Sequence, residues 1–370
     1  MKITGLHLYR YALPLDPAPE IKGKPLRHRE GILLRLTGDG IEGWGETAPL
    51  PGFSHESQEE AIRQLWDIKP ALMGLDHSNW MDDCLQSVLD PFTPAPSVRF
   101  GIELAASNLY AAARGKTLPE VLGPRPGMKV SLNGLLTGSR DDILKEVRGM
   151  ISTGYRAVKV KVGRGSIEED ASLIRAVAGI LGGSVSLRLD ANRAWSFEEA
   201  LEFARATEGC RYEYVEEPLS DPTQLLRLVD STGLSVALDE SLAALDPDTL
   251  GEHRYARAVV LKPTLLGGIK HTLRLAEQAQ SLIMTPVISS AFETGVGTLG
   301  LTSLAACISG GEIPVGLDTY RRFTTDVLEP RLELPAYFDV PEVMGVRRIV
   351  DQSLLKEIRD PEQATRSRDE

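Results

Sequence analysis

The sequence is poor in cysteine and contains no long apolar run. Its 370 residues include three cysteines, Cys84, Cys210 and Cys307, which lie far apart. An odd number of widely spaced cysteines fits neither a disulfide framework nor a zinc motif, so we expect buried thiols and a reducing compartment. No stretch approaches the roughly 18–20 apolar residues of a membrane span, and the N-terminus lacks a signal-peptide pattern. These absences predict a cytoplasmic protein without a membrane partner.

Positive charge is also scarce. The formal net charge is −11, which argues against general binding to nucleic acids. It does not exclude a small anionic substrate, because a site can be locally positive. Apolar residues make up 42% and charged residues 25%, values that are typical of a globular protein. A chain of this length usually divides its core between two domains.

The first 125 residues predict an α+β domain with antiparallel strands before helices. A proline-rich loop at 14–30 separates the first strand from a hairpin that turns at Gly38, Asp39 and Gly40. Ser97 is a candidate N-cap for the last helix. The expected strands are 2–13, 31–36 and 41–48, and the expected helices are 56–72, 78–88 and 97–114.

After residue 127, short apolar runs alternate with polar helical stretches. Eight runs are expected to be strands: 128–133, 157–162, 185–190, 212–216, 235–239, 258–262, 283–289 and 313–318. Their last polar residues are Asn133, Lys161, Asp190, Glu216, Asp239, Lys262, Ser289 and Asp318, at successive intervals of 28, 29, 26, 23, 23, 27 and 29 residues. The expected helices between them are 140–152, 168–181, 197–207, 222–231 and 270–280, with a weak one at 319–328. Intervals of this length fit βαβ units, and eight of them predict a (β/α)8-type TIM barrel at 126–320. Residues 321–370 are expected to return to the first domain and to end in a disordered tail.

Three consecutive predicted strands end in carboxylates. Asp190, Glu216 and Asp239 would meet at the carboxyl end of the barrel, where active sites of this class lie. Any one of them could instead cap the following helix. Together they would repel one another unless a cation lay between them. Without nearby His or Cys, oxygen ligands favour Mg²⁺ or Mn²⁺ over zinc.

Lysines flank these carboxylates. In 157–163 the valines alternate with Lys159 and Lys161, so both lysines share one face of a strand. A single strand of this kind commonly exposes its lysines to solvent. In an eight-stranded barrel, however, Lys262 would lie opposite Lys161, with the carboxylates between them. This arrangement suits removal of a proton next to a substrate carboxylate, with a lysine of lowered pKa as base.

The motifs KVKVG (159–163), RLDANRAW (188–195), VEEP (215–218), LDES (238–241) and LKPT (261–264) resemble the enolase superfamily, in its muconate-lactonizing subgroup. The resemblance implies an α+β capping domain on a modified barrel, one Mg²⁺, and abstraction of a proton α to a carboxylate. By motif, it implies that Asp190, Glu216 and Asp239 bind the metal. It also implies that Lys161 is the acid/base catalyst, Lys159 its electrostatic neighbour and Lys262 the opposing lysine.

Further motifs resemble the o-succinylbenzoate synthases of that subgroup: WGETAPLPGFSHE (44–56), PSVRFGIELA (96–105), PVISSAFETGVG (286–297) and GLDTY (316–320). This resemblance implies loss of water from a cyclohexadiene carboxylate that bears a succinyl arm, in menaquinone biosynthesis. Lys262 would then lie as a cation over the ring. The candidate substrate-binding residues are Ser289 and Ser290, with nearby backbone amides, Arg29 for an anionic arm, and Asn133 and Gly316 as cavity walls.

Other functions share parts of this pattern. N-Succinylamino-acid racemases use the same fold, metal and lysines, and muconate cycloisomerisation is a further option. Dipeptide epimerases typically carry Asp-x-Asp after the last strand, whereas Asp318 is followed by Thr319 and Tyr320. A Schiff-base aldolase would leave the three carboxylates unexplained. A non-catalytic barrel that only binds a ligand would need neither both lysines nor all three carboxylates.

Overall fold

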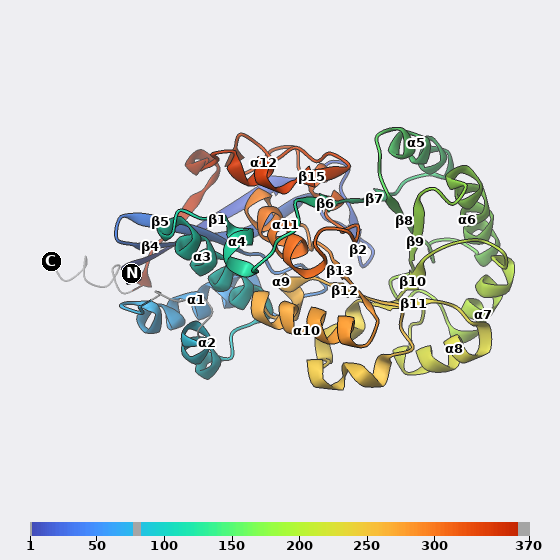
Figure 1. Cartoon of the computed structure of the whole chain (residues 1–370), viewed down its shortest axis with the longest axis horizontal. Helices are drawn as coiled ribbons and strands as arrows, with labels where there is room; N and C mark the ends of the chain where they lie inside the picture. The colour runs from blue at the N-terminus through green and yellow to red at the C-terminus, as the bar shows by residue number, and fades with distance from the viewer. Residues whose placement is uncertain (1, 77–82, 362–370) are drawn as a thin grey trace.

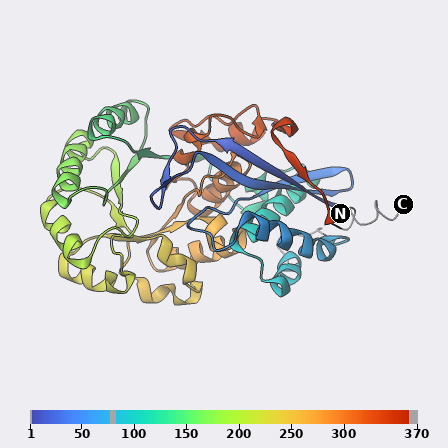
Figure 2. The ribbon, with the colours of Figure 1, turned by 180° about the vertical axis from the view of Figure 1, so that it is seen from behind.

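The computed structural model describes residues 2–76 and 83–361 and has two parts that lie side by side. One part is built around an antiparallel sheet near the N-terminus, and the other is a curved row of strands with helices on its outer side (Figure 1). The view from behind shows the same arrangement (Figure 2). No helix in these described ranges is long and apolar enough to cross a lipid bilayer.

The N-terminal sheet has four strands in the order β17-β1-β4-β5. The turn between β4 and β5 places Asp39 at φ 51° and Gly40 at φ 77°, as a two-residue hairpin turn requires. The expected hairpin is therefore confirmed. The elements of this part are β1 (Gly5–Pro14), β2 (Glu20–Ile21), β3 (Lys24–Pro25), β4 (His28–Gly38), β5 (Ile41–Thr47), α1 (Gln58–Leu72), α2 (Cys84–Leu89), η1 (Asp90–Phe92), α3 (Pro96–Ala113) and α4 (Leu118–Leu122).

Two expectations for this part were wrong. The loop expected at 14–30 is partly regular, because β2 and β3 form a short hairpin within it. Ser97 does not cap α3, since Pro96 occupies the first helical position and Ala95 precedes it. The Ser97 hydroxyl instead donates to Glu56. The start of the helix expected at 78–88 lies partly outside the described residues.

The second part is a parallel sheet of seven strands in the order β13-β12-β11-β10-β9-β8-β7. Helices follow most of these strands and cover the outer face of the sheet (Figure 1). The strands are β7 (Asn133–Leu136), β8 (Ala157–Lys161), β9 (Ser186–Asp190), β10 (Tyr214–Glu216), β11 (Val236–Leu238), β12 (Ala258–Leu261) and β13 (Thr285–Ile288). The helices are α5 (Arg140–Ser152), α6 (Ile167–Leu181), α7 (Phe197–Ala206), η2 (Pro222–Gln224), α8 (Leu225–Thr232), η3 (Glu240–Ala244), η4 (Pro247–His253), α9 (Pro263–Leu266), α10 (Ile269–Ser281) and α11 (Gly295–Ser309).

The eighth expected strand is reduced to two isolated bridges. Val315 pairs with Leu132, and Gly316 pairs with Ser289, so this segment still connects the two ends of the sheet. Pro314 precedes it and has no N–H to donate to a ladder, which limits the length of pairing. The expectation of a regular strand at 313–318 was therefore wrong, although the segment occupies the place of that strand.

The first expected barrel strand is also displaced. Residues Lys129–Ser131 form β6, which pairs antiparallel with β15 (Tyr337–Asp339). The barrel strand β7 begins at Asn133, so this residue starts a strand instead of ending one. The partner of β6 comes from the C-terminal region, about 200 residues later, and local periodicity contains no sign of that pairing.

The C-terminal segment returns to the first sheet, where β17 pairs antiparallel with β1. Residues from 362 onward, which include most of the expected disordered tail, lie outside the described residues. The remaining elements are η5 (Asp318–Arg322), β14 (Leu328–Glu329), α12 (Val340–Gly345), β16 (Ile349–Val350), η6 (Gln352–Leu354) and β17 (Lys356–Ile358).

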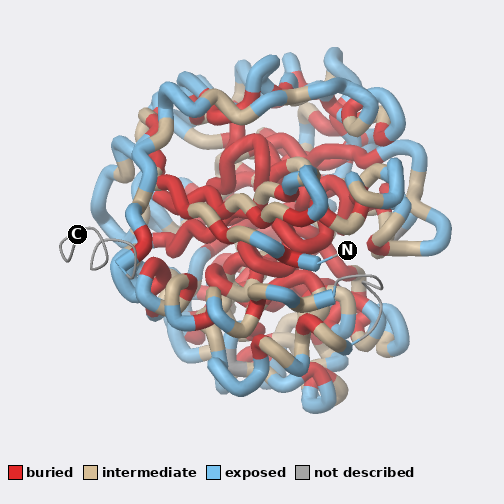
Figure 3. The backbone as a smooth tube through the Cα atoms, turned by 90° about the vertical axis from the view of Figure 1, so that its left-hand side faces the viewer, coloured by how far each residue is buried: buried red, intermediate tan, exposed pale blue. Residues whose placement is uncertain are grey.

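The buried residues form a large outer core and a small inner one. The outer core runs continuously through both parts, and Figure 3 shows buried backbone through the middle of the molecule with exposed segments around it. The inner core lies between barrel strands and consists of Tyr214, Ala237, Ala258, Val260 and Val287. The strand faces that carry this inner core continue into the polar strand ends described next.

Candidate active site

The carboxyl ends of the barrel strands surround a cavity of about 590 Å³. The N-terminal part contributes one wall through Pro17–Ile21, Leu50 and Phe53, so both parts of the molecule enclose it. Most of the candidate residues named from the sequence line this cavity: Lys159, Lys161, Asp190, Lys262, Ser289, Ser290, Asn133 and Gly316.

Strand register brings the charged residues of β8, β9 and β10 to one level. Lys161 is the Cα partner of Asp190, and Asp190 is the partner of Glu216. In β8, Val158 and Val160 are fully buried, while the two lysines face the cavity. The alternation seen in the sequence therefore has the predicted effect, because one face of the strand packs outward and the other carries amines.

The amines and carboxylates form a buried ion-pair network. Lys159 Nζ lies 3.1 Å from Glu216 Oε1, 3.0 Å from Glu216 Oε2 and 3.1 Å from Asp190 Oδ2. Lys161 Nζ lies 3.2 Å from the same Asp190 oxygen and also donates to Asn192. Lys262 pairs with Asp239.

Burial and neighbouring charge set the protonation of this network. Burial opposes the charge of Lys159, but Asp190 and Glu216 outweigh it and hold the pKa of Lys159 well above its usual value. Asp239 acts in the same way on the pKa of Lys262, which is also raised. Both lysines therefore remain cations near neutral pH.

The three carboxyl groups of the network differ in the direction of their pKa shifts. Burial, followed by repulsion from Asp190, raises the pKa of Glu216 to about 8. Burial also raises the pKa of Asp239, with Lys262 opposing. The pKa of Asp190 is lowered despite its burial, because Lys159, Lys161 and Lys262 all attract its charge. The pKa of Glu216 is therefore raised chiefly because the carboxylate is cut off from water, and the neighbouring Asp190 adds to the shift.

The same oxygens are a suitable donor set for a hard divalent cation. Asp190, Glu216 and Asp239 are at most 5% exposed, and carboxylate oxygens suit Mg²⁺ or Mn²⁺. Within residues 2–76 and 83–361, no group of three or more His, Cys, Asp or Glu side chains is already arranged to hold a metal ion. The ammonium groups of Lys159 and Lys262 contact these oxygens, so a divalent ion would compete with them.

The two adjacent glutamates after β10 have different environments. Glu216 faces the lysines, whereas Glu217 is fully buried and accepts from the backbone amides of Asp239 and Ser241 at 2.9 and 2.7 Å. Arg193 donates to the other oxygen of Glu217 at 3.0 Å. Glu217 therefore fixes the chain after β11, on which Asp239 lies.

Ser289 and Ser290 line the cavity, where the Ser289 hydroxyl donates to the Gly316 carbonyl at 3.3 Å and the Ser290 hydroxyl bonds to Thr319. The Ser289 amide donates to Leu261, and the Ser290 amide donates to Gly316. The Ala291 amide donates to Glu293 at 2.7 Å. The expected contribution of these amides to carboxylate binding was therefore wrong, because strand pairing and Glu293 use them.

Asn133 and Gly316 form the wall beside these serines. Asn133 is 3% exposed, and its Oδ1 is buried without a hydrogen-bond partner among the described residues. A Cβ at Gly316 would lie 2.6 Å from Ser289 Oγ, so a side chain there would displace that hydroxyl. Asn133 thus offers an unused acceptor, and Gly316 leaves space for Ser289.

Arg29 lies elsewhere. It is 1% exposed, does not line the cavity, and donates to five backbone carbonyls. Two of these carbonyls, of Ala291 and Phe292, belong to the barrel, and two others, of Ala48 and Pro49, belong to the N-terminal part. The suggestion that Arg29 meets an anionic arm was wrong, because its guanidinium joins the two parts of the molecule.

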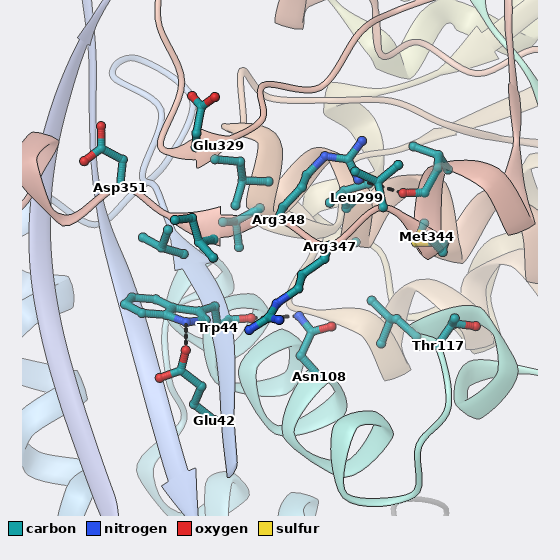
Figure 4. A pocket seen from close by; sticks show the side chains of 18 of the residues that line it. Glu42, Trp44, Asn108, Thr117, Leu299, Glu329, Met344, Arg347, Arg348 and Asp351 are labelled. Carbon is teal, nitrogen blue, oxygen red and sulfur yellow. Dashed lines mark hydrogen bonds between the residues drawn. The ribbon is translucent and has the colours of Figure 1, made fainter. Parts of the chain in front are cut away.

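A larger cavity of about 1000 Å³ lies away from the strand ends (Figure 4). It is lined by Trp44, Asn108 and Leu299 among others, and Trp44 Nε1 donates to Glu42 at 3.1 Å (Figure 4). None of the three carboxylates or three lysines of the network lines it. The cavity at the strand ends is therefore the candidate active site.

Comparison with known proteins agrees with this geometry. Residues 3–109 match the family model described as "MenC, N-terminal domain", and residues 142–346 match "Enolase C-terminal domain-like". An o-succinylbenzoate synthase of Klebsiella pneumoniae (strain 342) is 32% identical over 326 residues, which cover 87% of this chain and 93% of that protein. The chain belongs to the o-succinylbenzoate synthase family.

Solved structures support the fold. An N-succinyl Arg/Lys racemase from Bacillus cereus ATCC 14579 has a TM-score of 0.86 and 23% identity over 97% of this chain and 100% of the racemase. A muconate lactonizing enzyme from Pseudomonas fluorescens has a TM-score of 0.84 and 25% identity over 95% of this chain and 98% of that enzyme. The barrel fold inferred from the eight units is therefore confirmed, with the modified eighth strand described above.

Membership in the o-succinylbenzoate synthase family makes the chain a lyase of the enolase superfamily, whose members use a divalent metal ion.

Several residues of the site were not identified from the sequence. Asn192 has φ 43°, a conformation that asparagine tolerates better than most residues, and it contacts Lys161. The position of Asn192 within the motif RLDANRAW could have identified it as a site residue. Arg164 and Arg322 also line the cavity, but they lie in no motif that points to the site.

Proposed function

We propose that this chain converts 2-succinyl-6-hydroxy-2,4-cyclohexadiene-1-carboxylate to o-succinylbenzoate, a step of menaquinone biosynthesis. The observation that carries the proposal is the network of Asp190, Glu216, Asp239 and three lysines in a chain of this family. The substrate is a small carboxylate, in keeping with a cavity that contains several cations.

Lys161 is the proposed acid/base catalyst. As a neutral amine it takes the proton from the ring carbon that bears the carboxylate. It then returns a proton to the departing hydroxyl, so a C–H and a C–O bond break and water leaves. Its contacts with Asp190 and Asn192 hold the amine at the end of β8. A positioned general base of this kind contributes about 10²–10⁴-fold to the rate.

Lys159 and Lys262 are proposed to act as fixed positive charges. Their raised pKa values keep them protonated while negative charge develops on the substrate. Lys262 directly follows β12, on the other side of the carboxylates from β8. It would therefore stabilise the planar intermediate from the face opposite Lys161.

Asp190, Glu216 and Asp239 are the proposed ligands of Mg²⁺, with Mn²⁺ as a possible substitute. When bound, the ion would supply positive charge against the oxygens of the substrate carboxylate. Ser289, Ser290, Asn133 and Gly316 are proposed to form the substrate wall, through two hydroxyls, the unused side-chain carbonyl of Asn133 and, at Gly316, the lack of a side chain that would displace Ser289.

The test is an assay of purified protein with Mg²⁺ and the cyclohexadiene substrate, followed by ultraviolet absorbance. We expect formation of o-succinylbenzoate that stops on addition of EDTA and resumes with excess Mg²⁺. The alternative is racemisation of N-succinyl amino acids, which needs the same fold and lysines. Racemisation without any o-succinylbenzoate would replace the dehydration proposal, and activity that EDTA leaves intact would remove the metal from it.

A further inference from the structure

Two arginines line one end of the cavity, beside the strand that carries Lys161. Arg164 follows β8, and Arg322 lies at the end of η5. Thr137, which follows β7, lines the same end. This group is separate from the carboxylate and lysine network, and no step of the proposed proton transfer uses it.

The two carboxylates that line the cavity near these arginines, Asp318 and Asp142, are already bonded. Asp318 pairs with Arg321 at 2.6 Å and accepts from the Leu135 amide at 3.0 Å. Asp142 accepts from the amide and the hydroxyl of Ser139, in the capping box at the start of α5. Neither carboxylate is therefore available to neutralise Arg164 or Arg322.

The two arginines have no anionic partner among the described residues. Arg164 is exposed and makes no hydrogen bond or ion pair with any residue of the described ranges. Arg322 donates to the Pro17 carbonyl at 2.8 Å and to Thr137, both of which are neutral. Glu146 and Asp318 act on Arg322 only beyond ion-pair distance. Asp170 likewise acts on Arg164 without an ion pair, so neither guanidinium is in direct contact with a carboxylate of the described residues.

We propose that Arg164 and Arg322 bind the second carboxylate of the substrate, the one at the end of its succinyl arm. The inference rests on the proposed function and adds the site that selects a dicarboxylate. Arg322 is held in place by Pro17 and Thr137, while Arg164 is free to close on an anion. Guanidinium groups suit this task, because their planar N–H groups match a carboxylate.

The test compares Arg164→Gln with Arg211→Gln. Arg211 is also exposed and has no partner in the described ranges, but it precedes β10 and lies outside the cavity lining. We expect R164Q to raise KM about tenfold and to leave kcat within about twofold, because it removes binding that ground and transition states share. R211Q should behave as the unmodified protein.

Two ligands that differ only at the end of the succinyl arm make the test specific for the arm carboxylate. In R164Q the dissociation constant of o-succinylbenzoate should rise about tenfold, while that of its analogue with an arm carboxamide changes by less than about twofold. Equal changes for both ligands, or none, would overturn the proposal. Arg322→Lys, which keeps the charge, should weaken the carboxylate ligand less than Arg322→Gln does.

If the chain does not catalyse the proposed reaction, the experiments give a different result. In that case the unmodified protein forms no o-succinylbenzoate from the cyclohexadiene substrate. The arginines are then tested with an N-succinyl amino acid and its arm carboxamide, which carry the same terminal groups. A tenfold selective loss in R164Q would support the arginine site even then, and an unselective one would reject it.

Discussion

Lys161 contacts two different groups at the end of β8. Its Nζ lies 3.2 Å from a carboxylate oxygen of Asp190 and also donates to the side-chain carbonyl oxygen of Asn192. Lys159 takes most of the attraction of Glu216, which leaves Lys161 the more weakly paired of the two amines. This inequality is the reason for assigning proton transfer to Lys161 and a fixed charge to Lys159.

Replacement of Lys161 by alanine should abolish turnover and leave the fold intact. We expect kcat to fall by about 10³-fold or more, because no other amine lies at the same position. Steady-state assays and circular dichroism measure the two effects, with Lys145→Ala on the exposed side of α5 as control. Retention of a tenth of the activity would remove Lys161 from the acid/base role.

Local residue patterns predicted that these lysines and carboxylates meet at the strand ends, but they did not predict the position of Arg29. Lys161, Asp190 and Glu216 meet because parallel strands of similar length end at one level, which periodicity alone reveals. Arg29 instead bonds to Ala291 and Phe292, more than 260 residues away in sequence. A single buried cation with distant carbonyl partners leaves no repeating pattern for the sequence to show.

A helix or strand could be predicted from the sequence where its formation depends on its own residues and not on a distant partner. The six barrel strands β8 to β13 and most of the helices between them follow their own hydrophobic period, whereas β7 begins at the residue expected to end the first strand. The antiparallel β6 depends on β15, and the eighth strand is limited by Pro314. Helix α11 was not among the expected helices, since apolar and small residues cover all its faces and leave no polar stripe.

Arg29 links β4 to the segment that carries Ser289 and Ser290. Arg29→Met should lower the free energy of unfolding by about 3 kcal/mol, because buried carbonyls lose their donors. It should also raise KM, since Ala291 and Phe292 line the cavity and would be held less firmly. Urea unfolding and steady-state kinetics measure these two changes.

Arg27→Met is the matched control for this change. Arg27 lies two residues earlier, is exposed and has no side-chain partner in the described ranges. Its replacement should leave both stability and KM unchanged. Equal behaviour of the two variants would mean that the bonds of Arg29 do not hold the 291–292 segment in place.

At the scale of the whole molecule, the N-terminal sheet and the barrel depend on each other. The cavity needs Leu50 and Phe53 from one part and the strand ends from the other. The C-terminal segment joins them again through β17 and β1. The division into 1–125, 126–320 and 321–370 stays a prediction, and these contacts make separate folding of the pieces unfavourable.

Glu46 of β5 makes another deeply buried connection between the two parts. It is fully buried and accepts from the Tyr11 hydroxyl at 2.5 Å. It also accepts from the amides of Thr294 and Gly297, at 3.0 and 2.9 Å, where α11 begins. Burial raises the pKa of Glu46 to about 7, although the hydrogen bonds from Tyr11 and Thr294 oppose the shift.

This raised pKa predicts that the molecule loses stability as pH rises. Between pH 4.5 and 7 the folded chain keeps the Glu46 proton that the unfolded chain releases, so the contribution is present at pH 4.5 and lost above 7. The loss should be about 3 kcal/mol. Glu46→Gln cannot titrate, so the difference in unfolding free energy between it and the unmodified protein should change by about 2.5 kcal/mol, most of this loss, between pH 5 and 8. Glu42→Gln, on the exposed side of the same strand, should show no such change. A difference for E46Q that stays constant with pH would mean that Glu46 remains ionised where the two parts meet.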